Sequence, residues 1–97
     1  MAFNGTEGDW IVLTDAKTMT NEFRQQFPNE KQGAFLGKDK INSILSQNDC
    51  MGLRVYFAKN AAGELTIVMV GADSRELDLT NMILDFACPC PPFCGSI

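Results

Sequence analysis

The sequence over residues 51–70, MGLRVYFAKNAAGELTIVMV, decides the fold. Its first part alternates between two sets of side chains with the two-residue period of a β-strand: Leu53, Val55 and Phe57 form one set, and Arg54, Tyr56 and Ala58 form the other. A polar loop containing a glycine separates this strand from an apolar strand over 65–70. Two adjacent strands joined in this way predict a hairpin over about 51–70. The second strand is apolar on nearly both faces, so we expect it to be the more central one.

Two helices are predicted before the hairpin. Apolar side chains recur at three- and four-residue spacing over about 15–27, and Pro28 ends this helix because it disfavours helical backbone in the residue before it. A shorter periodic stretch begins near Gly37 and ends near Asn48. A helix this short depends on packing more than on its own propensity. Residues 28–33, between the two helices, are expected to be a polar connection.

The segment 77–86 fits both a helical stripe and an extended chain. We expect a strand or extended backbone here, because the proline-rich end of the chain prevents a helix from continuing. The predicted fold class is α+β: two N-terminal helices packed on one face of a small antiparallel sheet, followed by an extended Pro/Cys-rich tail. Residues 1–97 are expected to form a single domain, with an N-terminal arm at 1–9 and the tail at 87–97.

The composition excludes several kinds of catalytic site. The chain has 97 residues, of which 45% are hydrophobic and 21% charged, enough for one domain with a modest core. It has no histidine. Serine–histidine and cysteine–histidine nucleophile pairs, and zinc sites that use histidine, are therefore excluded. Because no nucleophile has an evident base, we expect no enzymatic activity.

The charge pattern makes nucleic acid and membrane partners unexpected. Eight basic and 12 acidic residues give a net charge of −4, and the basic residues are scattered singly along the chain. Binding to phosphates or to anionic lipids needs concentrated positive charge. No apolar stretch approaches the roughly 18 residues of a membrane span, and the first nine residues do not resemble a secretory signal. The expected location is cytoplasmic, with export by a non-classical route left open.

The tail concentrates unusual residues. Residues 88–94 contain three of the four cysteines and three of the four prolines. Four thiols are the number that an all-thiolate zinc site requires, so a zinc ion held by Cys50, Cys88, Cys90 and Cys94 is one interpretation. A second is a disulfide that joins Cys50 to the tail or Cys90 to Cys94. A reducing cytoplasm disfavours a structural disulfide, and Cys-Pro-Cys differs from the Cys-x-x-Cys spacing of redox sites.

Backbone geometry disfavours the zinc site. Each residue before a proline is biased towards an extended backbone, so we expect the tail to run straight. At about 3.1 Å per residue, Cys88 and Cys94 would lie roughly 19 Å apart, whereas two sulfurs on one zinc must nearly touch. A shared metal would need a sharp bend at Pro91-Pro92, such as a cis bond. The preferred expectation is therefore no cofactor, with zinc as the alternative.

The third interpretation of the tail, which we prefer, is a rigid apolar strap. It would lay aromatic and aliphatic side chains onto the core or onto another chain. The predicted interaction residues are Phe86, Pro91, Pro92, Phe93 and Ile97.

Three segments resemble a group of small uncharacterised bacterial proteins. The segments are 50–57, 65–71 and CPPFCG at 90–95. The group shares a Cys-x-Gly-Ile-Arg-x-Tyr strand, an apolar strand ending in Val-Gly and a Cys-Pro-Pro-x-Cys terminus; this chain has Leu53 at the isoleucine position. The resemblance covers about the last half of the chain and the Phe35-x-Gly-x-Asp39 segment. It implies no activity and supports only the expected domain boundaries.

Together these observations predict a non-enzymatic interaction or structural module. It would form a homo-oligomer or dock into a larger protein assembly through its apolar tail and an exposed strand edge. The alternative is a thiol-based site, binding zinc or acting in redox chemistry, formed by the tail cysteines with or without Cys50.

Overall fold

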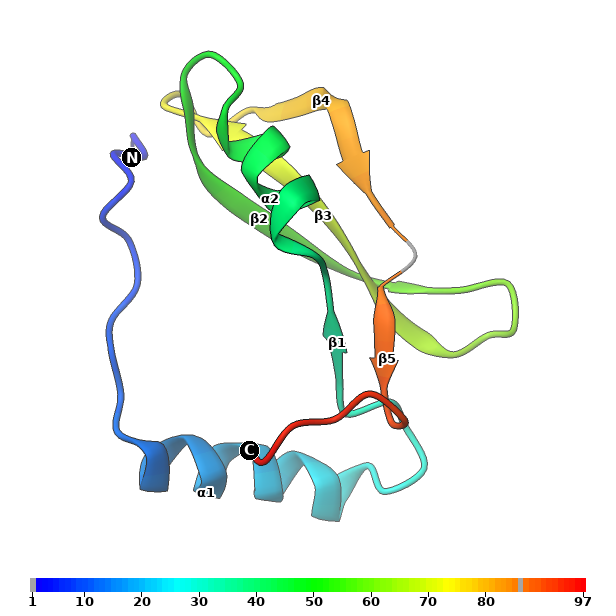
Figure 1. Cartoon of the computed structure of the whole chain (residues 1–97). Helices are drawn as coiled ribbons and strands as arrows, with labels where there is room; N and C mark the ends of the chain where they lie inside the picture. Colours follow the sequence, from blue (N-terminus) through cyan, green and yellow to red (C-terminus); the bar gives the residue numbers. More distant parts are fainter. Residues whose placement is uncertain (1, 86) are drawn as a thin grey trace.

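A computed structural model describes residues 2–85 and 87–97 of the chain. It is an α+β structure with two helices and two small antiparallel sheets (Figure 1). The elements in chain order are α1 (Leu13–Gln26), β1 (Gly33–Phe35), α2 (Lys38–Leu45), β2 (Cys50–Lys59), β3 (Leu65–Asp73), β4 (Asp78–Leu84) and β5 (Cys88–Cys90).

The larger sheet has the strand order β2-β3-β4. The β2–β3 hairpin is present and is longer than predicted, with Val55 opposite Met69 in the register and a loop closed by the Asn60 N–H, which donates to the Glu64 carbonyl (2.9 Å). As expected, the apolar β3 is the central strand. Within the ambiguous segment 77–86, Asp78–Leu84 forms β4, so the prediction of a strand is confirmed for these residues.

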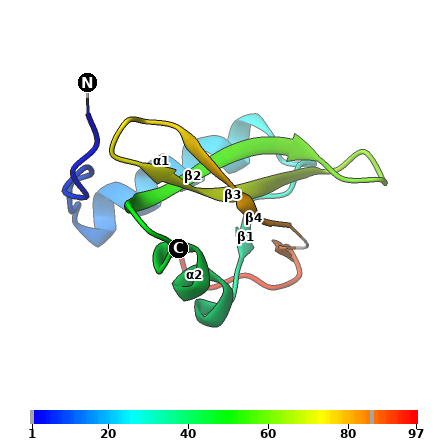
Figure 2. The same cartoon turned by 90° about the horizontal axis from the view of Figure 1, so that it is seen from above.

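Helix α2 packs on one side of the hairpin, as the sequence predicted (Figure 2). Its Ile44 is 2% exposed and is the largest fully buried side chain in the described chain. The contact depends on Gly71 of β3, where a Cβ atom would lie 3.0 Å from Ile44 Cγ2 and 2.9 Å from Cys50 Sγ. The glycine therefore allows the helix to approach the strand closely.

Helix α1 does not pack on the sheet, which corrects the prediction that both helices cover one face of it. It lies apart from the larger sheet and buries none of its residues (Figure 1). The small ribbon of β1 and β5 was not predicted either. Periodicity identified the apolar face of α1, but it carries no information about what covers that face.

The tail is extended only over β5, which corrects the prediction of a straight path. β5 pairs with β1, and Gly33 lies opposite Cys90 in the register. The peptide bonds Cys90-Pro91 and Pro91-Pro92 are cis, and the chain then turns back, with the Phe93 N–H donating to the Pro89 carbonyl (2.9 Å). A bias of single residues towards extended backbone does not prevent a turn when two consecutive prolines adopt cis bonds.

The buried core is small for a chain of this length. The buried hydrophobic residues in the described chain are Ile44, Val70 and Ala72. The radius of gyration is 14.8 Å, compared with about 12.5 Å expected for a compact domain of the same length. Much of the apolar surface is therefore left in water. In the described residues, no helix is both long and apolar enough to cross a membrane.

Candidate interaction surface

One long edge of the larger sheet is open. β2 pairs with β3 on one side, and no strand pairs with its other side in the described chain. Because Asn60 and Glu64 form a hydrogen-bonded pair, the alternation of an antiparallel ladder directs the backbone groups of every second residue away from β3. These residues are Leu53, Val55, Phe57 and Lys59. An unpaired edge of this kind can accept a strand from another chain.

One side chain of this edge, Phe57, lines an apolar groove. Phe57 is 84% exposed and, with Leu65 and Ile67 of β3, forms one wall of the groove. Met19 and Phe23 of α1 form the opposite wall. The groove has a volume of about 630 Å³. It is the space that an α1 packed on the sheet would have filled.

Charged residues lie at the rim of the groove. Lys31 Nζ lies 3.3 Å from Glu64 Oε2 and donates to the Pro91 carbonyl (3.2 Å). The pKa of Glu64 is lowered, first by the hydrogen bond from the Asn60 amide and then by Lys31. Lys59, at the end of the open edge, forms no ion pair within the described residues. The positive charge of Lys59 is thus available to a partner.

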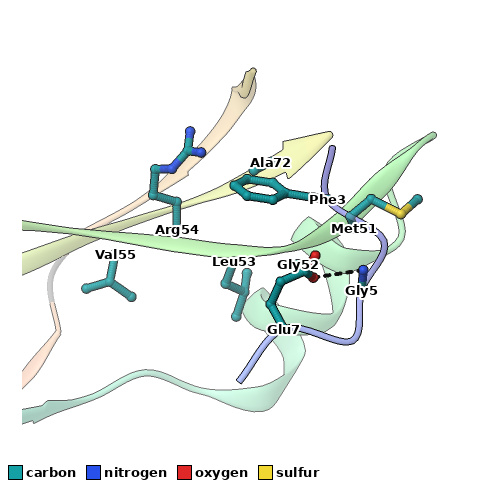
Figure 3. Close-up of a pocket in the computed structure, with 9 residues that line it drawn as sticks. All are labelled: Phe3, Gly5, Glu7, Met51, Gly52, Leu53, Arg54, Val55 and Ala72. Carbon is teal, nitrogen blue, oxygen red and sulfur yellow. Dashed lines mark hydrogen bonds between the residues drawn. The ribbon is translucent and has the colours of Figure 1, made fainter. Parts of the chain in front are cut away.

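The N-terminal arm covers only the beginning of the β2 edge. Gly5 passes close to the Met51 carbonyl, and the Glu7 carboxylate accepts the Gly5 N–H (2.9 Å), a contact drawn in Figure 3. Hydrogen bonds from the backbone N–H of Asn4 and its neighbours lower the pKa of Glu7. A shallow pocket of about 410 Å³ lies between the arm and this part of β2. Beyond Glu7 the arm leaves the sheet (Figure 1).

Arg54 and Tyr56 both bind the carboxylate of Asp78 in their own chain. Arg54 Nη1 lies 2.5 Å from Asp78 Oδ1, and the Tyr56 hydroxyl donates to Asp78 Oδ2 (2.5 Å). The Phe3 ring lies 5.4 Å from the Arg54 guanidinium carbon, and Figure 3 shows both side chains on the same side of β2. The hydrogen bond to Asp78 raises the pKa of Tyr56, and the hydrogen bonds from Tyr56 and Arg54 lower the pKa of Asp78. This cluster joins β2 to β4.

The predicted interaction residues of the tail lie on the surface. Phe93 is 64% and Ile97 50% exposed, and Pro91 and Pro92 are also exposed. The main-chain oxygen of Ile97 accepts hydrogen bonds from Arg24 and Thr20 of α1. The tail is therefore attached to α1 through its backbone, and its apolar side chains remain in solvent. The fifth predicted residue, Phe86, lies outside the described residues.

The cysteines divide into one bridged pair and two free thiols. Cys90 and Cys94 form a disulfide with a Cα–Cα distance of 4.7 Å. Cys88 is free and exposed, whereas Cys50 is free and half-buried beneath α2, where its Sγ donates to the Gly52 carbonyl (3.4 Å). No group of three or more His, Cys, Asp or Glu side chains is arranged to hold a metal within the described residues. Cys50 lies against Gly71, not against the tail.

Two parts of this surface were missed by the sequence analysis. Neither Phe57 nor the run Trp10-Ile11-Val12-Leu13 was included among the predicted interaction residues. Four consecutive apolar residues next to a polar arm are the signal that identifies the second part. The exposure of Phe57 had no sequence signal, because alternation does not specify which face of a strand is covered.

Searches against models of protein families, curated proteins and solved structures found no match for this chain.

Proposed function

We propose that this chain is a non-enzymatic interaction or structural module that self-associates or docks into a larger assembly. The observation that carries the proposal is the imbalance between exposed and buried apolar residues. In the described chain, seventeen large apolar side chains are exposed, whereas three hydrophobic residues are buried. Burial of apolar surface is the main driving force for association. Extended apolar patches on a soluble protein mark surfaces that bind other molecules.

The open β2 edge supports this proposal. Natural proteins protect edge strands with charged residues, prolines, bulges or short length. β2 is ten residues long and contains no proline, and its register shift, between Cys50 and Gly52, lies at its start, away from the open part of the edge. Three of the residues whose backbone groups face outwards, Leu53, Val55 and Phe57, are exposed and apolar. Such an edge favours β-strand addition, in which backbone hydrogen bonds provide affinity and side chains provide specificity.

The tail provides the second part of the proposed surface. Its backbone is held by β1 and α1, so Phe93 and Ile97 are presented on a fixed frame. Ordered apolar side chains lose less conformational entropy on binding than side chains of a free segment. The predicted interaction residues Pro91 and Pro92 belong to the same exposed turn.

Sedimentation velocity over a range of protein concentrations tests the proposal. We expect the chain to form oligomers. We expect the edge variant Val55→Lys/Phe57→Lys and the tail variant Phe93→Ser/Ile97→Ser to need at least tenfold higher concentration to associate. Leu45→Ser is the matched control, since Leu45 is exposed on α2 away from both surfaces. A wild-type chain that stays monomeric throughout, or two surface variants that associate normally, would contradict self-association.

The disulfide favours a second candidate function, a thiol-based site in the tail. Cys90 and Cys94 are close enough to exchange between a disulfide and a dithiol, and Cys88 provides an exposed thiol beside them. Zinc binding by Cys88, Cys90 and Cys94, with or without Cys50, is the alternative use of these thiols and requires the reduced form. Native mass spectrometry with and without reductant distinguishes the two, because a disulfide removes two hydrogen atoms and a bound zinc adds its own mass.

A further inference from the structure

An exposed apolar segment joins the N-terminal arm to helix α1. Asp9, Trp10, Ile11 and Val12 precede α1, and Val12 has an extended backbone (φ −79°, ψ 156°). Within the described residues, the N–H groups of these four residues donate no hydrogen bond. Trp10 is fully exposed, and Ile11 and Val12 are exposed by more than half. The Val12 carbonyl accepts the Ala16 N–H (3.1 Å), whereas the N–H groups of residues 9–12 are free in the described chain. Free N–H groups and apolar side chains suit this segment to adding a strand to a sheet.

The open part of the β2 edge can accept a strand of this kind. The N-terminal arm of the same chain reaches only the first residues of the β2 edge, near Met51, and leaves residues 56–59 uncovered. In this open part the backbone groups of Phe57 and Lys59 face outwards, by the alternation described above. The Phe57 side chain lies in the apolar groove. The open part, residues 56–59, and the apolar segment, residues 9–12, each contain four residues.

We infer that residues 9–12 of a second copy of this chain bind as an antiparallel strand to residues 56–59 of β2, an inference that rests on the proposed self-association. The alternation of the ladder sets the register. The backbone groups of Phe57 and Lys59 face outwards, so each of these residues must lie opposite a residue whose own backbone groups point towards β2. This register places Asp9 opposite Lys59, Trp10 opposite Ala58, Ile11 opposite Phe57 and Val12 opposite Tyr56. Ile11 then enters the groove, and the bulky Trp10 lies opposite the small Ala58.

Charge complementarity supports this register. Asp9 and Lys59 each form no ion pair within the described residues of their own chain. The antiparallel pairing that places Ile11 on Phe57 also brings these two opposite charges together. Opposite charges directly across a strand pair are stabilising, and like charges are destabilising. One register therefore satisfies both the apolar contact and the charges.

Two aromatic side chains supply much of the apolar area of the contact. Trp10 and Phe57 are 100% and 84% exposed. Each contact uses Trp10 of one copy and Phe57 of the other, and a buried aromatic side chain removes 150–250 Å² from water, so the two together bury on the order of 400 Å². That is about a quarter of the roughly 1,600 Å² that a standard interface buries in total. The rest of the groove and the arm backbone would provide the remainder.

The only tryptophan of the chain provides a direct test. Trp10 fluorescence and sedimentation velocity are measured on the full chain over one dilution series. We expect the emission to shift to shorter wavelength as oligomers form, with the same midpoint concentration as the change in mass. Oligomers whose tryptophan emission stays that of an exposed indole would overturn the arm contact and leave self-association standing. A short-wavelength emission that does not change with dilution would mean that the arm binds its own chain.

Charge reversal tests the register. We expect Asp9→Lys and Lys59→Glu each to weaken association about two- to tenfold, and the double variant to associate within about twofold of wild type. Glu22→Lys and Lys40→Glu change charge at exposed positions outside the contact and should have no effect. Single variants that associate as wild type, or a double variant without rescue, would overturn the pairing of Asp9 with Lys59.

The choice of edge is tested with two isoleucines of nearly equal exposure. Ile11 is 58% exposed on the arm, and Ile83 is 59% exposed on β4, the other edge strand. We expect Ile11→Asp to weaken association at least tenfold and Ile83→Asp to leave it within about twofold. The reverse result would place the interface at β4. It would overturn the inferred contact and leave the proposed self-association standing. A wild-type chain that never associates would instead contradict the self-association itself.

Discussion

Ile44 of α2 lies directly on Gly71 of β3, so closely that a Cβ atom at position 71 would be 3.0 Å from Ile44 Cγ2. This contact attaches α2 to the larger sheet. It joins the most deeply buried side chain of the described residues to a strand position with no side chain. The stability of the domain therefore depends on a small number of atoms.

Gly71→Ala is expected to destabilise the chain by about 1–3 kcal/mol, because the new methyl group would overlap Ile44 and Cys50 Sγ in a packed site. Gly52→Ala is the matched control, since a Cβ atom there meets nothing within 4 Å. Urea unfolding at a fixed protein concentration measures both effects. Equal stability of the two variants would contradict the close contact between α2 and β3.

Shortening the Ile44 side chain is expected to lower the free energy of unfolding in proportion to the volume removed. Ile44→Val should lower the free energy of unfolding by about 0.5–1.5 kcal/mol and Ile44→Ala by about 2–5 kcal/mol. Ile41→Val is the control within α2, because Ile41 is only half-buried and should cost less. The same urea experiment applies. A loss at Ile44 no larger than at Ile41 would mean that the core does not centre on this residue.

The single tyrosine reports on the cluster that joins β2 to β4. The hydrogen bond to Asp78 raises the pKa of Tyr56 above its ordinary value of about 10. Ultraviolet titration should show this rise, and Asp78→Asn should bring the pKa of Tyr56 back towards 10. Asp39→Asn, at an exposed carboxylate on α2, is the control. A Tyr56 pKa that is the same in wild type and Asp78→Asn would argue against the hydrogen bond.

The same cluster predicts the pH dependence of stability. The pKa of Asp78 is lowered in the folded chain, so its contribution is present above about pH 4 and is lost as pH falls through the folded pKa. The pKa of Tyr56 is raised, so its contribution is present below about pH 10 and is lost as pH rises through the folded pKa. Asp78→Asn should flatten both limbs of the stability profile, measured by thermal unfolding. Wild-type and variant profiles of the same shape would contradict this coupling.

The disulfide predicts how many thiols an alkylating reagent can modify. After denaturation without reductant, alkylation should modify two thiols, Cys50 and Cys88, and after reduction it should modify all four. Cys94→Ser is the control and should expose three thiols without reductant. In the folded protein Cys88 should react faster than the half-buried Cys50. Four reactive thiols in air-oxidised protein would contradict the pairing of Cys90 with Cys94.

Local pattern was sufficient for much of the fold. The alternation over 51–70 predicted the β2–β3 hairpin, and the continuous apolar run of β3 correctly indicated a central strand. Helical spacing predicted both helices close to their observed bounds, with α1 ending at Gln26, just before Pro28. These features depend on neighbours within a few residues, where backbone preference and side-chain period act directly. The absence of histidine likewise excluded whole classes of site.

Contacts between distant residues could be decided only by the tertiary structure. Sequence spacing gave no reason for Gly33 to lie opposite Cys90, for α1 to lie apart from the sheet, or for Phe57 to stay in solvent. The sequence left several disulfide pairings open. In the structure the chain turns after Pro91, and Cys94 forms the disulfide with Cys90. The physical reason is that the hydrophobic period and the backbone propensity of a segment specify only which of its faces is apolar. The surface that covers this face is formed by distant parts of the chain and, in the proposed assembly, by a partner.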